Sequence, residues 1–101
     1  MTAPGAKHDA GKSDWSLLPF DALGAVANVL TYGAAKYNDR SDNWARVEGG
    51  RDRYTAALLR HIAAWRLGQP FDPETGAHHL AHAACCALFL LARELRGIDG
   101  R

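Results

Sequence analysis

The chain has 101 residues, which is enough for one domain with a single hydrophobic core. Its 12 Lys and Arg residues nearly balance 11 acidic residues, and the formal net charge is only +1. Binding of long nucleic acid needs many phosphate contacts and is therefore disfavoured. An anionic ligand has to be held by a few local cations, which favours a nucleotide or another small phosphorylated molecule.

The apolar and cysteine content indicates a protein of the cytoplasm. Cys85 and Cys86 are adjacent and have no further cysteine to pair with, so we expect a reducing compartment and no disulfide framework. The longest apolar run, 83–92, is too short to cross a membrane, and no charged leader precedes an apolar segment at the start of the chain. We therefore expect no membrane contact.

The N-terminal residues 1–18 have neither helical nor strand periodicity, and we expect them to form an arm or loop. Residues 19–97 are expected to form a single helical domain. Pro19 suits the first position of a helix. Apolar residues then recur at spacings of three and four, at Phe20, Leu23, Ala27, Leu30, Ala34 and Tyr37. The turn-forming residues 38–44 predict that this helix ends near Tyr37.

A second helix is expected from about 51 to 67, between the glycine pair 49–50 and Gly68, which suits a helix C-terminus. The residues Asp72-Pro73-Glu74-Thr75 have the features of a helix start, so a third helix is expected from there to about Arg96. Its predicted core stripe is Leu80, Ala84, Leu88, Leu91 and Leu95, and a second stripe beside it is His78, His82, Cys85 and Phe89.

The absence of any strand pattern makes the predicted fold all-α. We expect a small antiparallel helical bundle of about three main helices joined by short loops. The helix surfaces are rich in Ala and Gly, which favours close helix packing between copies of the chain and therefore a homo-oligomer. A monomer whose helices use small residues to pack closely is the alternative.

Residues 53–91 concentrate the polar chemistry of the chain, since they hold four of its 5 histidines. A purely structural pair of helices needs none of these side chains, so their concentration around one helix junction predicts a polar site. The residues concerned are Arg53, Arg60, His61, Asp72, Glu74, His78, His79 and His82.

Arg53 and Arg60 lie two helical turns apart on one face, and alanines on the same face leave space above it. Guanidinium groups bind phosphate oxygens through paired, charge-assisted hydrogen bonds. An exposed arginine face that pairs with nearby acids is an equally open interpretation. An aromatic side chain in a polar turn, Trp44, is a candidate for stacking on a base. The predicted ligand- and phosphate-binding residues are Lys12, Lys36, Trp44, Arg53, Arg60 and His82.

His78 and His82 are four residues apart, a spacing that lets two imidazoles on one helix face share a metal ion. Hydrogen bonding within the structure is the alternative role for such a pair. The segment reads HHLAH and lacks the glutamate of an HExxH motif, and no EExxE cluster is present for magnesium. The candidate metal ligands are Asp72 and His78, with Mg²⁺ or Mn²⁺ as the candidate cofactor.

A family resemblance is carried by two stretches, GKSDWSLLPFDALGAVANVLTYGAAKYNDRSDNW and RYTAALLRHIAAWRLGQPFDPETGAHHLAHAACCALFLL. Together they resemble the N-terminal domains of the dATP/dGTP diphosphohydrolases, a family of small phage proteins, over about residues 11–95. The resemblance implies hydrolysis of purine deoxynucleoside triphosphates. The family pattern falls on Lys12, Tyr32, Gly33, Lys36, Tyr37, Asn43, Trp44, Arg53, Tyr54, Arg60, His61, Trp65, Asp72, Glu74, His78, His79 and His82.

The favoured hypothesis is a phage protein of the host cytoplasm that binds a purine nucleotide or a related phosphorylated ligand. In its catalytic form it hydrolyses dATP or dGTP at a phosphoanhydride bond. The candidate catalytic residues are then His61, His79 and Glu74, with one of the histidines as general base or acid. One alternative is a non-catalytic sponge that sequesters a nucleotide immune signal of the host, as an anti-defence protein. Another is an accessory protein that binds a host protein through its Ala-rich helices.

Overall fold

The computed structural model describes residues 4–36 and 43–100 and is all-helical over them. Its long helices are α1 (Phe20–Lys36), α3 (Gly50–Arg66) and α4 (His79–Arg96), and the shorter elements are η1 (Trp15–Leu17) and α2 (Asn43–Arg46). The predicted all-α fold with three main helices is therefore confirmed within these ranges. The expected end of the first helix at Tyr37 lies outside the described residues.

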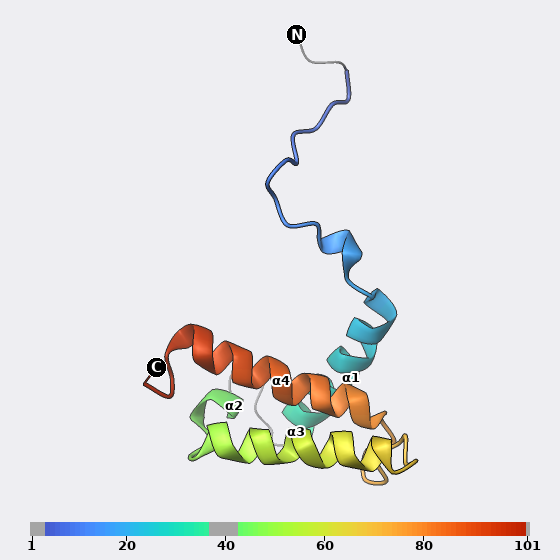
Figure 1. The fold of residues 1–101 in the computed structure, drawn as a ribbon, viewed down its shortest axis with the longest axis vertical. Coiled ribbons are helices and arrows are strands. Elements are labelled where there is room, and N and C mark those ends of the chain that lie inside the picture. The colour runs from blue at the N-terminus through green and yellow to red at the C-terminus, as the bar shows by residue number, and fades with distance from the viewer. Residues whose placement is uncertain (1–3, 37–42, 101) are drawn as a thin grey trace.

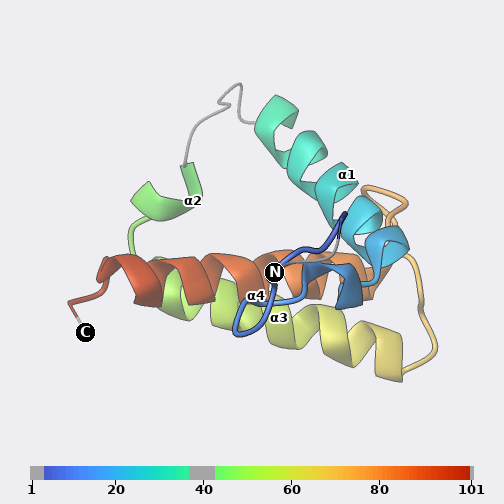
Figure 2. The ribbon, with the colours of Figure 1, turned by 90° about the horizontal axis from the view of Figure 1, so that it is seen from above.

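The helices α3 and α4 form an antiparallel hairpin, joined by the loop 67–78 (Figure 1). The N-terminal helix α1 contacts α4 and crosses it obliquely (Figure 2). The segment before η1 extends away from the three long helices (Figure 1). The hairpin is thus the central unit, and α1 covers one end of it.

Helix α1 begins where the sequence predicts, because Leu23 donates its backbone N–H to the carbonyl of Pro19 at 3.0 Å. Its packing face differs from the expected stripe. Val26 is the buried residue of this helix, whereas Phe20 and Leu30 of the predicted stripe are 64% and 39% exposed. The contact with α4 therefore uses a neighbouring face of α1, and much of the predicted stripe remains in solvent.

Helix α3 begins and ends close to the predicted positions. At its C-terminus Gly68 has a φ of 90°, the left-handed conformation that favours glycine. The N–H of Gly68 bonds to the carbonyl of Trp65, and the N–H of Gln69 bonds to the carbonyl of Ala64, both at 3.0 Å. These bonds satisfy carbonyls that the helix itself leaves without partners.

The predicted start of the third helix at Asp72 is wrong, since α4 begins at His79. Gly76 has a φ of 75° and turns the chain before the helix starts. Backbone N–H groups of Asp72 and His79 then bond across the loop to the carbonyls of Ala77 and Pro70, each at 2.8 Å. Those bonds fix residues 70–79 as a closed loop. Residues 72–75, whose sequence resembles a helix start, therefore form a turn.

The predicted leucine core of α4 is also wrong. Leu80, Leu88, Leu91 and Leu95 are 40%, 46%, 55% and 78% exposed. The buried hydrophobic residues of α4 are instead small ones, Ala81, Ala83, Cys85 and Cys86. Small side chains let α4 approach its neighbours closely, and this close approach leaves the leucines on the outer face.

None of the helices in the described part of the chain has the length and apolar character to span a membrane.

Arg93 of α4 is buried and connects this helix to α2. Its guanidinium donates to both carboxylate oxygens of Asp99, at 3.1 and 2.7 Å, and to the carbonyl of Trp44 at 2.9 Å. A Cβ atom at Gly50 would lie 2.6 Å from Nη1 of Arg93. The absence of a side chain at Gly50 therefore provides the space for this guanidinium.

Candidate functional site

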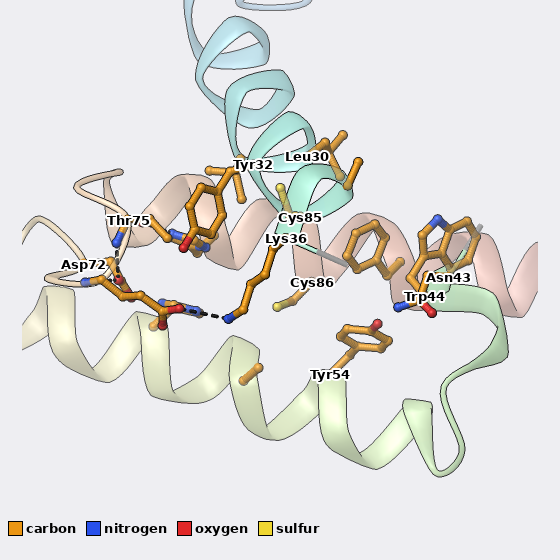
Figure 3. A pocket seen from close by; sticks show the side chains of 18 of the residues that line it. Leu30, Tyr32, Lys36, Asn43, Trp44, Tyr54, Asp72, Thr75, Cys85 and Cys86 are labelled. Atoms are coloured by element: carbon orange, nitrogen blue, oxygen red, sulfur yellow. Dashed lines mark hydrogen bonds and ion pairs between the residues drawn. The ribbon is translucent and has the colours of Figure 1, made fainter. Parts of the chain in front are cut away.

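A cavity of about 590 Å³ lies between α1, α2 and the α3–α4 hairpin (Figure 3). Ligand pockets in proteins typically measure about 300 to 1,000 Å³. Each of the four α-helices and the loop 67–78 contributes to the lining. The residues that line it are Val29, Leu30, Tyr32, Gly33, Ala34, Lys36, Asn43, Trp44, Tyr54, Ala57, Arg60, His61, Asp72, Glu74, Thr75, His82, Cys85, Cys86 and Phe89.

One end of the cavity is aromatic. The rings of Trp44 and Phe89 stack with centroids 5.2 Å apart, and Tyr54 meets Phe89 edge-on at the same separation. The guanidinium carbon of Arg96 lies 5.0 Å from the Trp44 ring. Trp44 thus lines the cavity, and its ring also packs against other side chains of the protein.

The opposite end of the cavity is polar, and Figure 3 shows Asp72 and Thr75 there, away from Trp44 and Tyr54. Lys36 extends from α1 toward this end, where its ammonium group donates to Oε1 of Glu74 at 2.8 Å. Arg60 of α3 lines the same cavity. Two predicted phosphate-binding cations, Lys36 and Arg60, are therefore brought to one cavity together with Glu74.

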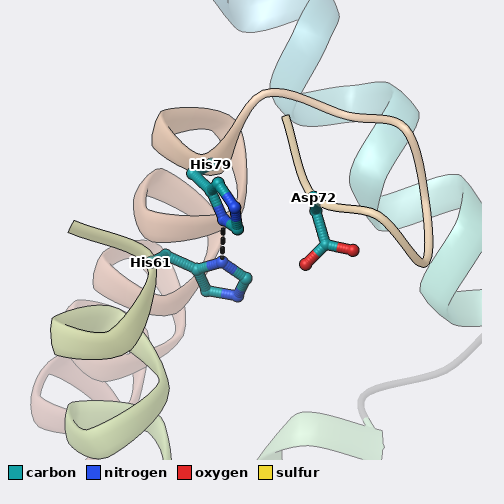
Figure 4. Close-up of side chains that lie close together, drawn as sticks. All are labelled: His61, Asp72 and His79. Carbon is teal, nitrogen blue, oxygen red and sulfur yellow. Dashed lines mark hydrogen bonds between the residues drawn. The ribbon is translucent and has the colours of Figure 1, made fainter. Parts of the chain in front are cut away.

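Three histidines gather at the polar end. The Nδ1 atoms of His61 and His79 lie 2.9 Å apart, and Figure 4 shows the two rings facing each other across the hairpin. The ring of His82 stacks on that of His61 with centroids 4.6 Å apart and planes within 7°. Nε2 of His82 is also 2.6 Å from Oγ1 of Thr75. The hairpin thus brings His61, His79 and His82 together in one imidazole cluster.

The surroundings of His61 and His82 favour neutral imidazoles. Burial lowers the pKa of His61, and the neighbouring His82 and His79 lower it further. Burial also lowers the pKa of His82, although the carboxylate of Asp72 partly opposes this effect. At neutral pH these rings are therefore available as proton acceptors or as metal ligands.

Asp72 completes this end of the cavity. Its Oδ1 atom accepts the backbone N–H groups of Glu74 at 2.8 Å and Thr75 at 3.0 Å. Burial acts to raise the pKa of this carboxyl, but the two amide hydrogen bonds together with the nearby His82 and His61 outweigh burial, and the pKa is lowered. The carboxylate is therefore ionised, and one ligand atom each from His61, Asp72 and His79 lie within 4.8 Å of one another.

The remaining predicted site residues lie elsewhere. His78 is the N-cap of α4, where its Nδ1 atom accepts the N–H of Leu80 at 3.0 Å, and its ring meets Phe71 edge-on. Arg53 lines a neighbouring depression, which Arg60 also borders. Lys12 belongs to the exposed segment that extends away from the helices (Figure 1).

Cys85 and Cys86 line the cavity as free thiols. Burial raises the pKa of Cys85 to about 11 and also raises the pKa of Cys86. The Sγ atom of Cys85 donates to the carbonyl of Val26 at 3.6 Å. Both thiols are therefore protonated at neutral pH and unsuited to act as nucleophiles, and Cys85 contacts α1 through Val26.

Thr75 is a site residue that sequence reasoning missed. Besides its contact with His82, its Oγ1 atom accepts the N–H of Ala77 at 3.2 Å. The sequence Asp72-Pro73-Glu74-Thr75 could have indicated a turn at this position. Asp followed by Pro is also typical of a turn in which the Asp side chain accepts hydrogen bonds from the next backbone amides.

The fold and the cavity define a small helical module with a nucleotide-sized, partly polar pocket. A family model described as dATP/dGTP diphosphohydrolase, N-terminal, matches residues 2–101. The chain belongs to this family, which confirms the resemblance seen in the sequence.

A relative from Salmonella phage PMBT28, named dATP/dGTP diphosphohydrolase, is 35% identical to the chain over 86 residues. The aligned part covers 85% of this chain but only 28% of that relative. The chain therefore corresponds to a minor part of the longer protein. No solved structure matches the chain.

Proposed function

We propose that the chain binds a purine deoxynucleoside triphosphate in the cavity between α1 and the α3–α4 hairpin, and hydrolyses it at a phosphoanhydride bond. The observation that carries this proposal is the division of one cavity of about 590 Å³ into an aromatic end and a polar end. A nucleotide has the same division between base and phosphates. The names of the family and of the phage relative point to the same class of ligand.

In this proposal the phosphates bind at the polar end. Arg60 offers a guanidinium that can form paired hydrogen bonds to phosphate oxygens, and Lys36 offers an ammonium group that lines the same cavity. The base then lies toward Tyr54 and Trp44, where stacking on an aromatic ring contributes about 1 to 3 kcal/mol. The exposed Tyr32 of α1 borders the same cavity and offers a further flat surface.

Hydrolysis would take place beside the histidine cluster. Water adds to the α-phosphorus, the bond between that phosphorus and the bridging oxygen breaks, and pyrophosphate leaves, so that a nucleoside monophosphate and one proton remain. Neutral imidazoles in the cluster suit the acceptance of that proton, because burial lowers the pKa of His61 and His82. Glu74, paired with Lys36, lies at the same end of the cavity.

The test is incubation of the purified chain with each of the four deoxynucleoside triphosphates, with and without Mn²⁺ or Mg²⁺, followed by chromatography of all products. Conversion of dATP and dGTP to monophosphate and pyrophosphate is the expected result. Recovery of intact nucleotide after denaturing the loaded protein would instead favour a non-catalytic sponge. Absence of both binding and turnover would reject the nucleotide site.

The substitution Arg60→Ala tests where the phosphates bind. Charge-assisted hydrogen bonds contribute about 1.5 to 3 kcal/mol, so we expect the dissociation constant for dATP to rise at least about tenfold. Calorimetric titration measures it. Arg51→Ala is the matched control, since Arg51 is an exposed arginine of the same helix that does not line the cavity. Equal affinity of the two variants would contradict this placement.

A further inference from the structure

We infer that His61, His79 and Asp72 form a binding site for one divalent first-row transition metal ion, at the polar end of the cavity. This site goes beyond the nucleotide proposal, because it rests on the protein's own side chains and can be tested without a nucleotide. It also differs from the sequence-based prediction, which paired Asp72 with His78.

The spacing of the ligand atoms fits such an ion. An ion held at about 2.1 Å by each ligand places neighbouring ligand atoms roughly 3.0 to 3.4 Å apart. The Nδ1 atoms of His61 and His79 are 2.9 Å apart, and the full set with Asp72 lies within 4.8 Å. Figure 4 shows the carboxylate of Asp72 directed toward the two rings. Binding of an ion therefore requires the carboxylate of Asp72 to move closer to the two imidazoles.

The ligands are held in place by the elements that carry them. His61 lies in the middle of α3, and His79 is a buried residue in the first turn of α4. The backbone amides of Glu74 and Thr75 both bond to Oδ1 of Asp72, which fixes the carboxylate while Oδ2 takes no part in these bonds. Metal sites generally depend on such supporting contacts to orient their ligands.

The mixture of ligand atoms indicates the class of metal. Two imidazole nitrogens and one carboxylate suit Mn²⁺, Fe²⁺, Co²⁺ or Zn²⁺, whereas Mg²⁺ prefers oxygen ligands and retains several waters. His61 and Asp72 line the cavity, so the coordination positions that the protein leaves open would face any ligand bound there. The Mn²⁺ of the sequence-based prediction is compatible with this set, and Mg²⁺ is disfavoured.

The charges of the cavity lining support the same inference. The charged residues that line it are Lys36, Arg60, Asp72 and Glu74, so two positive and two negative formal charges cancel. A divalent cation would give this end the positive charge that a polyphosphate requires.

A hydrogen bond between His61 and His79 without any ion is the competing explanation of their short separation. In that case one ring donates its N–H to the other, and Asp72 plays no part. The two explanations predict different effects of substitutions, because only an ion links the carboxylate of Asp72 to both imidazoles.

The experiment is titration of the chelator-treated full chain with Co²⁺ and Zn²⁺, followed by calorimetry and by the visible absorption of Co²⁺. We expect one ion per chain, and binding at least about tenfold weaker in both His61→Ala and Asp72→Asn. The substitution Asp72→Asn retains an oxygen for the two amide bonds, so its fold is readily checked by circular dichroism without metal. His8→Asn, in the exposed N-terminal segment, is the control and should bind as the parent does.

Three results would overturn the inference. They are failure of the parent chain to bind either ion at submillimolar concentration, equal binding by Asp72→Asn and the parent, and loss of binding in the His8→Asn control. Because no nucleotide is present, none of these outcomes depends on the proposed function. Conversely, binding of a metal ion without binding of dATP would support the metal site and contradict the nucleotide site.

Discussion

A single buried guanidinium, that of Arg93, positions the aromatic end of the cavity. It bonds to the carbonyl of Trp44 and to both oxygens of Asp99, and thereby holds α2 against α4. The hydrogen bonds that Arg93 donates to Asp99 are the main reason why the pKa of Arg93 is raised above its usual value. The placement of Trp44 beside the ligand cavity therefore depends on a residue outside the cavity.

The substitution Arg93→Met should lower the free energy of unfolding by about 3 kcal/mol, because it removes the buried guanidinium that bonds to the carboxylate of Asp99 and to the carbonyl of Trp44. Urea unfolding followed by circular dichroism measures this change. The nucleotide affinity of the folded variant should also fall, since Trp44 loses its anchor. Arg51→Ala serves again as the control, and a stability loss no larger than in that exposed variant would contradict the role given to Arg93.

Most of the residues at the polar end of the cavity could be predicted from the sequence, but their contacts could not. His61 and His79 were both predicted site residues, yet they are 18 positions apart and their contact arises only from the register of the hairpin. The partner carbonyl of Arg93 is 49 positions away, and backbone carbonyls have no sequence signature. Residue types could therefore be predicted, whereas pairings that depend on helix packing could not.

At the level of elements, the loop 67–78 determines where the site residues lie. It carries Asp72 and Thr75 to the histidine cluster, and Gly76 reverses the chain before α4. The pattern of 72–75 is equally suited to a turn and to a helix start. In the structure Gly76 has a left-handed conformation and residues 72–75 form a turn. The presence of a glycine in the sequence does not show that the residue adopts this conformation.

The substitution Gly76→Ala should destabilise the protein by about 1 kcal/mol or more, because a left-handed φ is unfavourable for residues with a Cβ atom. Gly24→Ala is the matched comparison, since Gly24 lies within α1 and no heavy atom is within 4 Å of the added Cβ. This variant should gain about 0.5 to 1 kcal/mol. Thermal unfolding of both variants measures the difference, and a gain in stability for Gly76→Ala would contradict the turn.

At the scale of the whole molecule, the helices leave much apolar surface in solvent. Among the described residues no large side chain is fully buried, while Leu88, Leu91 and Leu95 form an exposed row on α4. The three-helix pattern could be predicted because each helix has its own apolar period and end signals. The face of α4 that points outward could not be predicted from the sequence. Leucine is normally a core residue, but in α4 the small residues pack inward and the leucines are exposed.

We propose that a second copy of the chain covers this row of leucines. Light scattering coupled to size-exclusion chromatography should therefore show a homo-oligomer, and Leu91→Glu should shift it to the monomer by placing a charge in the apolar contact. Leu67→Glu is the control, since Leu67 is exposed at the end of α3 and lies outside the row. A parent chain that elutes as a monomer at high micromolar concentration would refute the proposal.

The ion pair between Lys36 and Glu74 connects α1 to the loop at the mouth of the cavity. In the proposed nucleotide complex, a phosphate at Lys36 would compete with Glu74 for the ammonium group. Exposed ion pairs contribute only about 0 to 1 kcal/mol, so the exchange costs little. The same ammonium group can therefore stabilise the position of α1 in the empty protein and an anion in the loaded one, and added salt would weaken both contacts together.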